Sequence, residues 1–205
     1  MGTMVVPSIP VGFASVHWMN MLQCLGRGGM LKVKYYYYWI ALFVFVIDYV
    51  TKKVIVNYVA IDEQIHVLGN HFFIITLHHN KGAAFGILQE QTLLFITITL
   101  LVVAGIVWYM VKNRNSGKAL LLTGLGLVLG GAFGNFLDRA LYGQVVDFLQ
   151  FTFGSYVFPI FNLADSGIVC GVGLILLDAI LSMKNENGDS NERNKQSEHD
   201  GQQSI

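Results

Sequence analysis

Two long runs of residues without a charge set the strongest limit on how this chain can fold. They occupy residues 92–111 and 119–137. A helix needs roughly 20 apolar residues to cross the hydrocarbon core of a bilayer, and both runs have that length. Two further segments, 35–58 and 159–183, are also long enough, although they contain ionisable residues. We therefore expect four transmembrane helices.

The composition agrees with a membrane protein. Of 205 residues, 54% are hydrophobic and only 13% are charged, which is about half the charged fraction of a soluble domain. Lys and Arg total 13, and so do Asp and Glu. The chain thus lacks the basic excess that nucleic-acid binding needs, and we expect no such partner. Cys24 and Cys170 lie in unrelated contexts, so we expect neither a disulfide framework nor a zinc site.

Loop charges predict the orientation in the membrane. The link between the second and third expected helices, residues 112–118, contains basic residues and no acid, and so does the segment 27–34 before the first helix. Both are cytoplasmic by the positive-inside rule. Residues 59–90 and 138–156 then face outward, and both chain ends lie in the cytoplasm.

The outward segment 61–79 has the composition of strands. It is rich in β-branched and aromatic residues, and Gly69 and Asn70 interrupt it with a turn signal. We expect a small extracytoplasmic β-sheet lying on the membrane surface. The predicted fold class is therefore an all-α polytopic membrane protein with four transmembrane helices and this added sheet.

The two ends of the chain differ from its middle. Residues 184–205 are almost entirely polar, so we expect a disordered cytoplasmic tail. Residues 1–29 resemble neither a membrane helix nor a secretory signal, because their charges follow the apolar part. We expect them to be an extension without function, with Met30 as the natural start. The functional domain is then 30–183.

Ionisable residues inside membrane segments are costly and mark functional sites. Asp48 lies some 20 Å along the first helix from its cytoplasmic end, and Lys52 is one turn further. Asp165 lies about 10 Å from the outer end of the fourth helix. The outer end of the third helix carries three more polar residues, Asn135, Asp138 and Arg139. These residues converge on the outer third of the bilayer, which predicts a polar pocket at the membrane surface.

Helix spacing gives two of the carboxylates a neighbouring cation. Lys52 is one turn from Asp48, and Arg139 adjoins Asp138, so we expect two structural ion pairs. A pure ion pair that locks the first helix to its neighbours explains Asp48 and Lys52 as well as a catalytic role does.

Asp147 and Asp165 are then left without a cation. Asp147 follows the third helix after a short loop, and Asp165 shares the first turns of the fourth helix with Asn162. Two adjacent carboxylates share a proton and divide into an acid and a base, which is the equipment for activating water against a peptide carbonyl. On the residues alone, a hydrogen-bonded structural pair is an equal alternative.

Five ordered sequence blocks resemble the lipoprotein signal peptidase (signal peptidase II) family. The blocks are Asp48-Tyr49-Val50-Thr51-Lys52, Asn80-Lys81-Gly82-Ala83-Ala84-Phe85-Gly86, Gly130-Gly131-Ala132-Phe133-Gly134-Asn135-Phe136-Leu137-Asp138-Arg139, Val145-Val146-Asp147-Phe148 and Phe161-Asn162-Leu163-Ala164-Asp165-Ser166. The resemblance covers residues 35–183. It departs from the family at Tyr49, where Gln is usual, and at His79, where Arg is common.

The resemblance implies an aspartic-type membrane endopeptidase that cleaves bacterial prolipoproteins just before their diacylglyceryl-modified cysteine. It places the catalytic dyad at Asp147 and Asp165. The supporting residues that it implies are Asp48, Lys52, Asn80, Gly82, Asn135, Asp138, Arg139 and Asn162. It also implies no cofactor, a monomer in the bacterial cell membrane, and contacts with lipidated prolipoproteins and membrane lipids on an outward-facing site.

Other chemistries have weaker support in the sequence. Four histidines gather in the outer segment, at His66, His71, His78 and His79. Their spacing matches no metal-binding motif, and we expect no metal. A Ser–Lys peptidase needs an outer serine beside a desolvated lysine. Only Ser155 and Ser166 have the right depth, and Ser166 adjoins a carboxylate.

Two readings from other functional classes remain. A small proton-coupled transporter would use Asp48, Lys52 and Asp165 as a relay, but it should show internal repeats and polar groups near the membrane midplane. The sequence has neither. A structural assembly factor would leave the unpaired carboxylates without a purpose.

Overall fold

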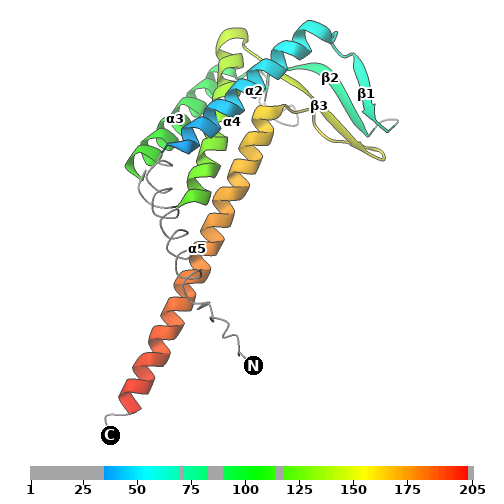
Figure 1. The fold of residues 1–205 in the computed structure, drawn as a ribbon. Coiled ribbons are helices and arrows are strands. Elements are labelled where there is room, and N and C mark those ends of the chain that lie inside the picture. The colour runs from blue at the N-terminus through cyan, green and yellow to red at the C-terminus, as the bar shows by residue number, and fades with distance from the viewer. Residues whose placement is uncertain (1–34, 70–71, 83–89, 114–117, 203–205) are drawn as a thin grey trace, which may run out of the picture. The chain divides into compact units, whose positions relative to one another are not determined.

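The computed structural model describes residues 35–69, 72–82, 90–113 and 118–202, and the fold lies almost wholly in the unit Tyr37–Ile205 (Figure 1). The predicted extension 1–29 and the start at Met30 lie outside the described residues.

Four long helices are present where the hydrophobic segments predicted them. They are α2 (Tyr36–Tyr58), α3 (Thr92–Lys112), α4 (Ala119–Tyr142) and α5 (Leu163–Gln202). Among the described residues, α3, α4 and the Leu163–Lys184 part of α5 are long and apolar enough to cross a membrane. The 23-residue α2 has the length but carries three charged residues, Asp48, Lys52 and Lys53.

Helix α4 is longer than predicted because hydrogen bonding continues after the apolar run ends. The prediction stopped at residue 137, but Asp138 and Arg139 belong to the last turns of the helix. The helix ends at Gly143, which has the left-handed φ of 71° and donates its N–H to Arg139 O at 3.0 Å. Glycine adopts this conformation without steric cost, so it terminates the helix here.

Helix α5 begins and ends later than predicted. Residues 159–162 precede the helix because Asn162 accepts the N–H of Asp165 with its side chain, which is the geometry of a helix N-cap. At the other end, α5 continues to Gln202 through the segment that we expected to be disordered. No proline interrupts this segment, and a formed helix is extended at low cost one residue at a time.

The sheet is larger than predicted. It has four strands in the order β1-β2-β3-β4, namely β1 (Gln64–Leu68), β2 (Phe73–Asn80), β3 (Val145–Phe153) and β4 (Tyr156–Val157), and Figure 1 shows the first three side by side. The outer segment 61–79 therefore supplies only half of the strands. The other half follows α4, where the prediction had loop. All neighbouring strands are antiparallel.

Helix α4 is the centre of the helical packing. Four of its glycines lie where an added Cβ would meet neighbouring backbone: Gly126 and Gly130 face α2, and Gly124 and Gly131 face α5. These glycines therefore permit α4 to pack closely against α2 and α5. A smaller apolar cluster joins α2 to the sheet and contains Ile55, Val59, Leu77, Val146 and Phe148.

Many apolar side chains on the helices point away from the protein. Trp39 and Leu101 are each 70% exposed, and Val169 is 71% exposed. Apolar surface of this extent is characteristic of helices whose solvent is lipid.

Candidate active site

Lys52 of α2 lies where α2 contacts α4. Its ammonium group is 2.8 Å from Asp48 Oδ2 and 2.9 Å from Asp138 Oδ2, and it donates to Asn135 Oδ1 at 2.9 Å. An ammonium group has three hydrogens, so these acceptors use all of them. Lys52 is only 4% exposed. The predicted Asp48–Lys52 ion pair is confirmed, and Asp138 joins it.

Asp48 also connects α2 to the start of α5. Its Oδ1 accepts the backbone N–H of Ala164 at 2.9 Å, and the residue is fully buried. The N–H groups in the first turn of a helix have no partner within the helix. A carboxylate from α2 supplies one here, which fixes the position of the turn that carries Asp165.

The predicted ion pair between Asp138 and Arg139 was wrong. Asp138 faces Lys52 and the N–H of Val146, which is 3.4 Å away. The guanidinium of Arg139 instead donates to Gly82 O at 3.1 Å and lies 4.7 Å from the ring centre of Phe95. Adjacent residues of a helix point about 100° apart, so neighbours in sequence reach different partners.

Asp147 lies in strand β3 and not in a loop as predicted. It is 2% exposed and accepts hydrogen bonds from two side-chain amides. Asn80 Nδ2 donates to Asp147 Oδ2 at 2.9 Å, and Asn162 Nδ2 donates to Oδ1 at 2.7 Å. Asn80 is itself held by the N–H of Gly82, which donates to Asn80 Oδ1 at 2.9 Å.

Asp165 lies in the first turn of α5 and is half-buried. Asn135 Nδ2 donates to its Oδ1 at 2.7 Å, and the backbone N–H of Asn162 lies 3.3 Å from its Oδ2. Because the side chain of Asn162 accepts the N–H of Asp165 in return, the two residues cap the helix reciprocally.

Hydrogen bonds and ion pairs connect all ten residues singled out by sequence. The members are Asp48, Lys52, Asn80, Gly82, Asn135, Asp138, Arg139, Asp147, Asn162 and Asp165. Within the described part of the chain, neither Asp147 nor Asp165 has a cation within 4.0 Å. Amides hold this pair, whereas Lys52 forms ion pairs with Asp48 and Asp138.

The environment of Asp147 favours its protonated form. Burial raises the pKa of this carboxyl from 3.8 to about 7, and the negative charge of Asp165 adds to the effect. The amides of Asn80 and Asn162 act in the opposite direction, because their hydrogen bonds favour the carboxylate. Asp147 thus has a proton available near neutral pH.

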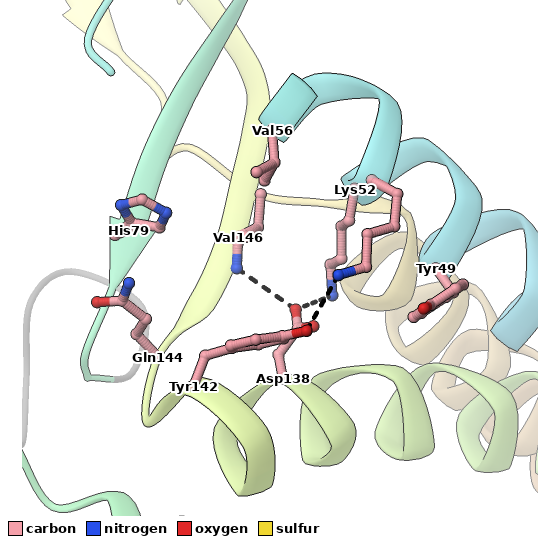
Figure 2. Close-up of a pocket in the computed structure, with 9 residues that line it drawn as sticks. Tyr49, Lys52, Val56, His79, Asp138, Tyr142, Gln144 and Val146 are labelled. Atoms are coloured by element: carbon pink, nitrogen blue, oxygen red, sulfur yellow. Dashed lines mark hydrogen bonds and ion pairs between the residues drawn. The ribbon is translucent and has the colours of Figure 1, made fainter. Parts of the chain in front are cut away.

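A pocket of about 160 Å³ lies beside the Lys52–Asp138 ion pair (Figure 2). Its lining comes from the C-terminal halves of α2 and α4 and from the segments of β2 and β3, and neither Asp147 nor Asp165 belongs to it. The lining residues are Tyr49, Lys52, Lys53, Val56, His79, Asp138, Tyr142, Gln144 and Val146. The sequence did not identify Lys53, Tyr142 or Gln144 as residues of a pocket. The only signal for a pocket was that they lie near the C-terminal ends of α2 and α4.

Two residues of the alternative chemistries lie next to the amide-held pair: His78 is the register partner of Asp147 across β2 and β3, and Ser166 directly follows Asp165. His78 Nδ1 is 4.0 Å from Asp62, His79 lines the pocket, His66 lies in β1, and His71 is outside the described residues. Ser166 donates its hydroxyl to Asn162 O at 3.1 Å. Ser155 is exposed in the turn between β3 and β4.

Comparison with known proteins places this arrangement in a family. The family model described as signal peptidase (SPase) II matches residues 40–181. A lipoprotein signal peptidase from Bacillus pumilus is 46% identical over 149 residues, which cover 73% of this chain and 95% of the relative. One from Brevibacillus brevis is 48% identical over 150 residues, which cover 73% and 97%.

Solved structures show the same fold. A bacterial membrane enzyme determined by the in meso method at 2.3 Å resolution matches with a TM-score of 0.65 and 38% identity, over 71% of this chain and 88% of the other. A second, determined at 1.9 Å resolution, matches with a TM-score of 0.59 and 40% identity, over 67% and 88%. This multi-pass membrane protein, whose conserved fold surrounds two amide-held carboxylates, therefore belongs to the signal peptidase II family of proteases.

Proposed function

We propose that the protein is an aspartic endopeptidase that removes signal peptides from bacterial prolipoproteins and cuts just before the diacylglyceryl-modified cysteine. Its similarity to relatives named lipoprotein signal peptidase supports the substrate class. The observation that carries the chemistry is the pair Asp147 and Asp165: both are hydrogen-bonded to Asn162, Asp165 through its backbone N–H, and neither has a cation within 4.0 Å among the described residues. A transporter or an assembly factor would not explain why a member of a protease family has this pair of carboxylates.

In the first step, a water molecule attacks the carbonyl carbon of the scissile peptide bond. Asp165 accepts a proton from the water, and Asp147 donates its proton to the carbonyl oxygen. The product is a neutral gem-diol, so no full negative charge develops on oxygen. Each carboxyl changes its protonation state once, which a pair with separated proton affinities does at low cost.

In the second step, the gem-diol collapses. The carbon–nitrogen bond breaks, and the nitrogen takes the proton that Asp165 received from water. Asp147 recovers a proton from one hydroxyl of the diol, which becomes the new carboxyl group of the signal peptide. Both carboxyl groups return to their starting states, and the modified cysteine becomes the new amino terminus.

The local environments support this division of roles. Asp147 is buried, and its pKa is raised to about 7, which suits an acid. Asp165 is half-buried at the N-terminus of α5, where the helix dipole and the N–H of Asn162 favour a negative charge.

The remaining network residues are positioning residues. Asn80, Asn135 and Asn162 aim the two carboxylates through directional hydrogen bonds. The Lys52 ammonium ties α2 to α4 through Asp138 and Asn135. Preorganised supporting groups of this kind keep reacting atoms within a narrow range of geometry.

We further propose that α2 is a fourth membrane span and that the enzyme is a monomer. Both chain ends then lie in the cytoplasm, and the site faces outward. Basic residues at 112–118 support this orientation. The test is labelling of Asn115→Cys in a protein without its two native cysteines. Labelling from the cytoplasmic side is expected, and labelling only from outside would overturn the topology.

The function is tested by cleavage of two matched precursor peptides, one carrying the diacylglyceryl group on its cysteine and one without it. Mass spectrometry of the products identifies the cut bond. We expect the lipidated peptide to be cut directly before the cysteine, the other peptide to be cut far more slowly, and the Asp147→Asn variant to cut neither. Equal cleavage of both peptides would contradict the substrate assignment. Full activity of Asp147→Asn would contradict the dyad.

A further inference from the structure

The pocket beside Lys52 and Asp138 has no part in the proposed reaction. It opens at the C-terminal halves of α2 and α4, and its lining carries two lysines and one carboxylate. Asp138 is already engaged by Lys52 at 2.9 Å. The charge that remains for a ligand is the ammonium group of Lys53.

Lys53 is held at the pocket by aromatic residues and not by an acid. Its Nζ donates to Tyr142 Oη at 3.0 Å and lies 5.0 Å and 5.6 Å from the ring centres of Tyr142 and Tyr49. Within the described residues, no carboxylate lies within 4.0 Å of it. Figure 2 shows Tyr142 and Tyr49 flanking the ion pair. A half-exposed ammonium group whose described contacts are a hydroxyl and two aromatic rings is available to an anion.

An apolar track on α2 leads along the helix to Lys53. Val46, Val50 and Val54 follow one another at intervals of four residues and are 45%, 50% and 47% exposed. Tyr49 and Lys53 have the same spacing on the adjoining row, so both rows lie on one side of the helix. One side of α2 thus carries an apolar stripe made of Val46, Val50 and Val54. The cationic pocket lies at the end of this stripe.

We propose that this pocket binds the phosphate of a membrane phospholipid whose acyl chain lies along the valine stripe of α2. Lys53 supplies the charge, and the side chains of His79 and Gln144 line the same cavity and supply hydrogen-bonding groups. Lysine and tyrosine at the ends of membrane helices lie at the depth of lipid headgroups. The apolar stripe favours a lipid over a soluble phosphate, because a soluble anion leaves that stripe uncovered.

The test is native mass spectrometry of the full chain in detergent, titrated with palmitoyl-oleoyl-phosphatidylglycerol. We expect Lys53→Gln to weaken binding about ten-fold, the lower end of what a hydrogen bond to a charged group contributes. Lys53→Arg should restore it. The matched control is Lys112→Gln, which removes a lysine that also lies over an aromatic ring, that of Trp108, but lines no described pocket. Its affinity should stay within about two-fold of wild type.

Two further probes separate the sources of the anion. Palmitoyl-oleoyl-glycerol, which has the acyl chains without the phosphate, should bind weakly and equally to wild type and Lys53→Gln. Inorganic phosphate should compete only at concentrations far above those of the lipid. Competition by inorganic phosphate at lipid-like concentrations would overturn the lipid assignment. Equal losses in Lys53→Gln and Lys112→Gln would show unspecific surface charge, and tight binding of palmitoyl-oleoyl-glycerol would exclude phosphate recognition. Unchanged melting of Lys53→Gln in zwitterionic detergent verifies that the variant is folded.

Discussion

The side-chain amide of Asn162 donates a hydrogen bond of 2.7 Å to the carboxylate of Asp147. The same side chain accepts the N–H of Asp165 at 2.9 Å. The Asn162 amide therefore positions the carboxyl of Asp147 directly. It positions the carboxyl of Asp165 through the first turn of α5. In this arrangement, side-chain amides hold both carboxyls: Asn80 and Asn162 donate to Asp147, and Asn135 donates to Asp165.

The two functions of Asn162 are separable by mutation. Asn162→Ala removes both the helix cap and the donor to Asp147. Asn162→Ser keeps a good capping group and removes the amide donor to Asp147. We expect both variants to lose about 10–100-fold in kcat, as for a lost hydrogen bond to a charged group. Only the alanine variant should also melt at a lower temperature, by the equivalent of about 1 kcal/mol. Similar melting of the two variants would show that the cap does not stabilise the fold.

The dyad predicts that its two mutations are not additive. Asp147→Asn and Asp165→Asn each keep the size of the side chain and remove the proton exchange, so each should abolish turnover in the peptide cleavage assay. The double variant should be hardly slower than either single one, because the two residues act as a unit. Binding of the lipidated peptide should persist in all three. Multiplying losses would show that the carboxyls act independently, and Asp138 would then be the next carboxylate to test.

The raised pKa of Asp147 predicts the alkaline limb of the pH–rate profile. The proposed acid is active when protonated, so kcat should fall as the pH rises through about 7 and the proton is lost. Asn80 stabilises the ionised form of Asp147, and Asn80→Ala should therefore move this limb to higher pH while lowering its plateau. The measurement is kcat with saturating lipidated peptide across the pH range. If the alkaline limb did not move in Asn80→Ala, the limb would have to arise from the titration of a group other than Asp147.

Much of this site follows from the sequence, and the failures have identifiable causes. The helices were predictable because a long uncharged apolar segment is stable mainly as a helix that crosses the bilayer. The Asp48–Lys52 pair was predictable because it is local, four residues apart on one helix. The partners of Asp138 and Arg139 were not, because they come from α2 and from the loop at Gly82, and the choice between them depends on how helices pack.

Strand β3 was missed although its composition contains a strand signal. Residues 145–153 are rich in valine and phenylalanine, as strands are. Residues 149–153 alternate between apolar and polar side chains, as a half-buried strand does, but Asp147 and Phe148 depart from that alternation. Asp147 and Gln150 are nevertheless buried, because the strand pairs with β2 on one side and Asp147 faces the active-site amides. The functional residue therefore obscured the structural signal.

The buried Lys52 should be one of the most sensitive positions for stability. Lys52→Met leaves Asp48 and Asp138 buried without a counter-charge, which costs about 3–5 kcal/mol. The expected result is a large drop in the melting temperature in detergent. Combining it with Asp48→Asn and Asp138→Asn removes the uncompensated charges and should recover part of the loss. Lys118→Met, at the exposed start of α4, is the control and should melt like wild type. No recovery in the triple variant would show that the packing of the lysine chain, and not its charge, is what matters.

Helix α4 approaches Asp48 closely at Gly134. A Cβ at Gly134 would lie 2.5 Å from Asp48 Oδ2, the same oxygen that pairs with Lys52. Gly134→Ala must therefore displace the carboxylate and disturb the hydrogen bond that the N–H of Ala164 donates to Asp48, which fixes the turn carrying Asp165. We expect lower thermal stability and a fall in kcat together. Gly105→Ala on α3 is the matched control, since no atom lies within 4 Å of its added Cβ. In a helix interior alanine is preferred over glycine by about 1 kcal/mol, so that variant should be as stable as wild type or more stable. Equal behaviour of the two variants in melting and in cleavage would show that Asp48 does not transmit its position to the catalytic turn.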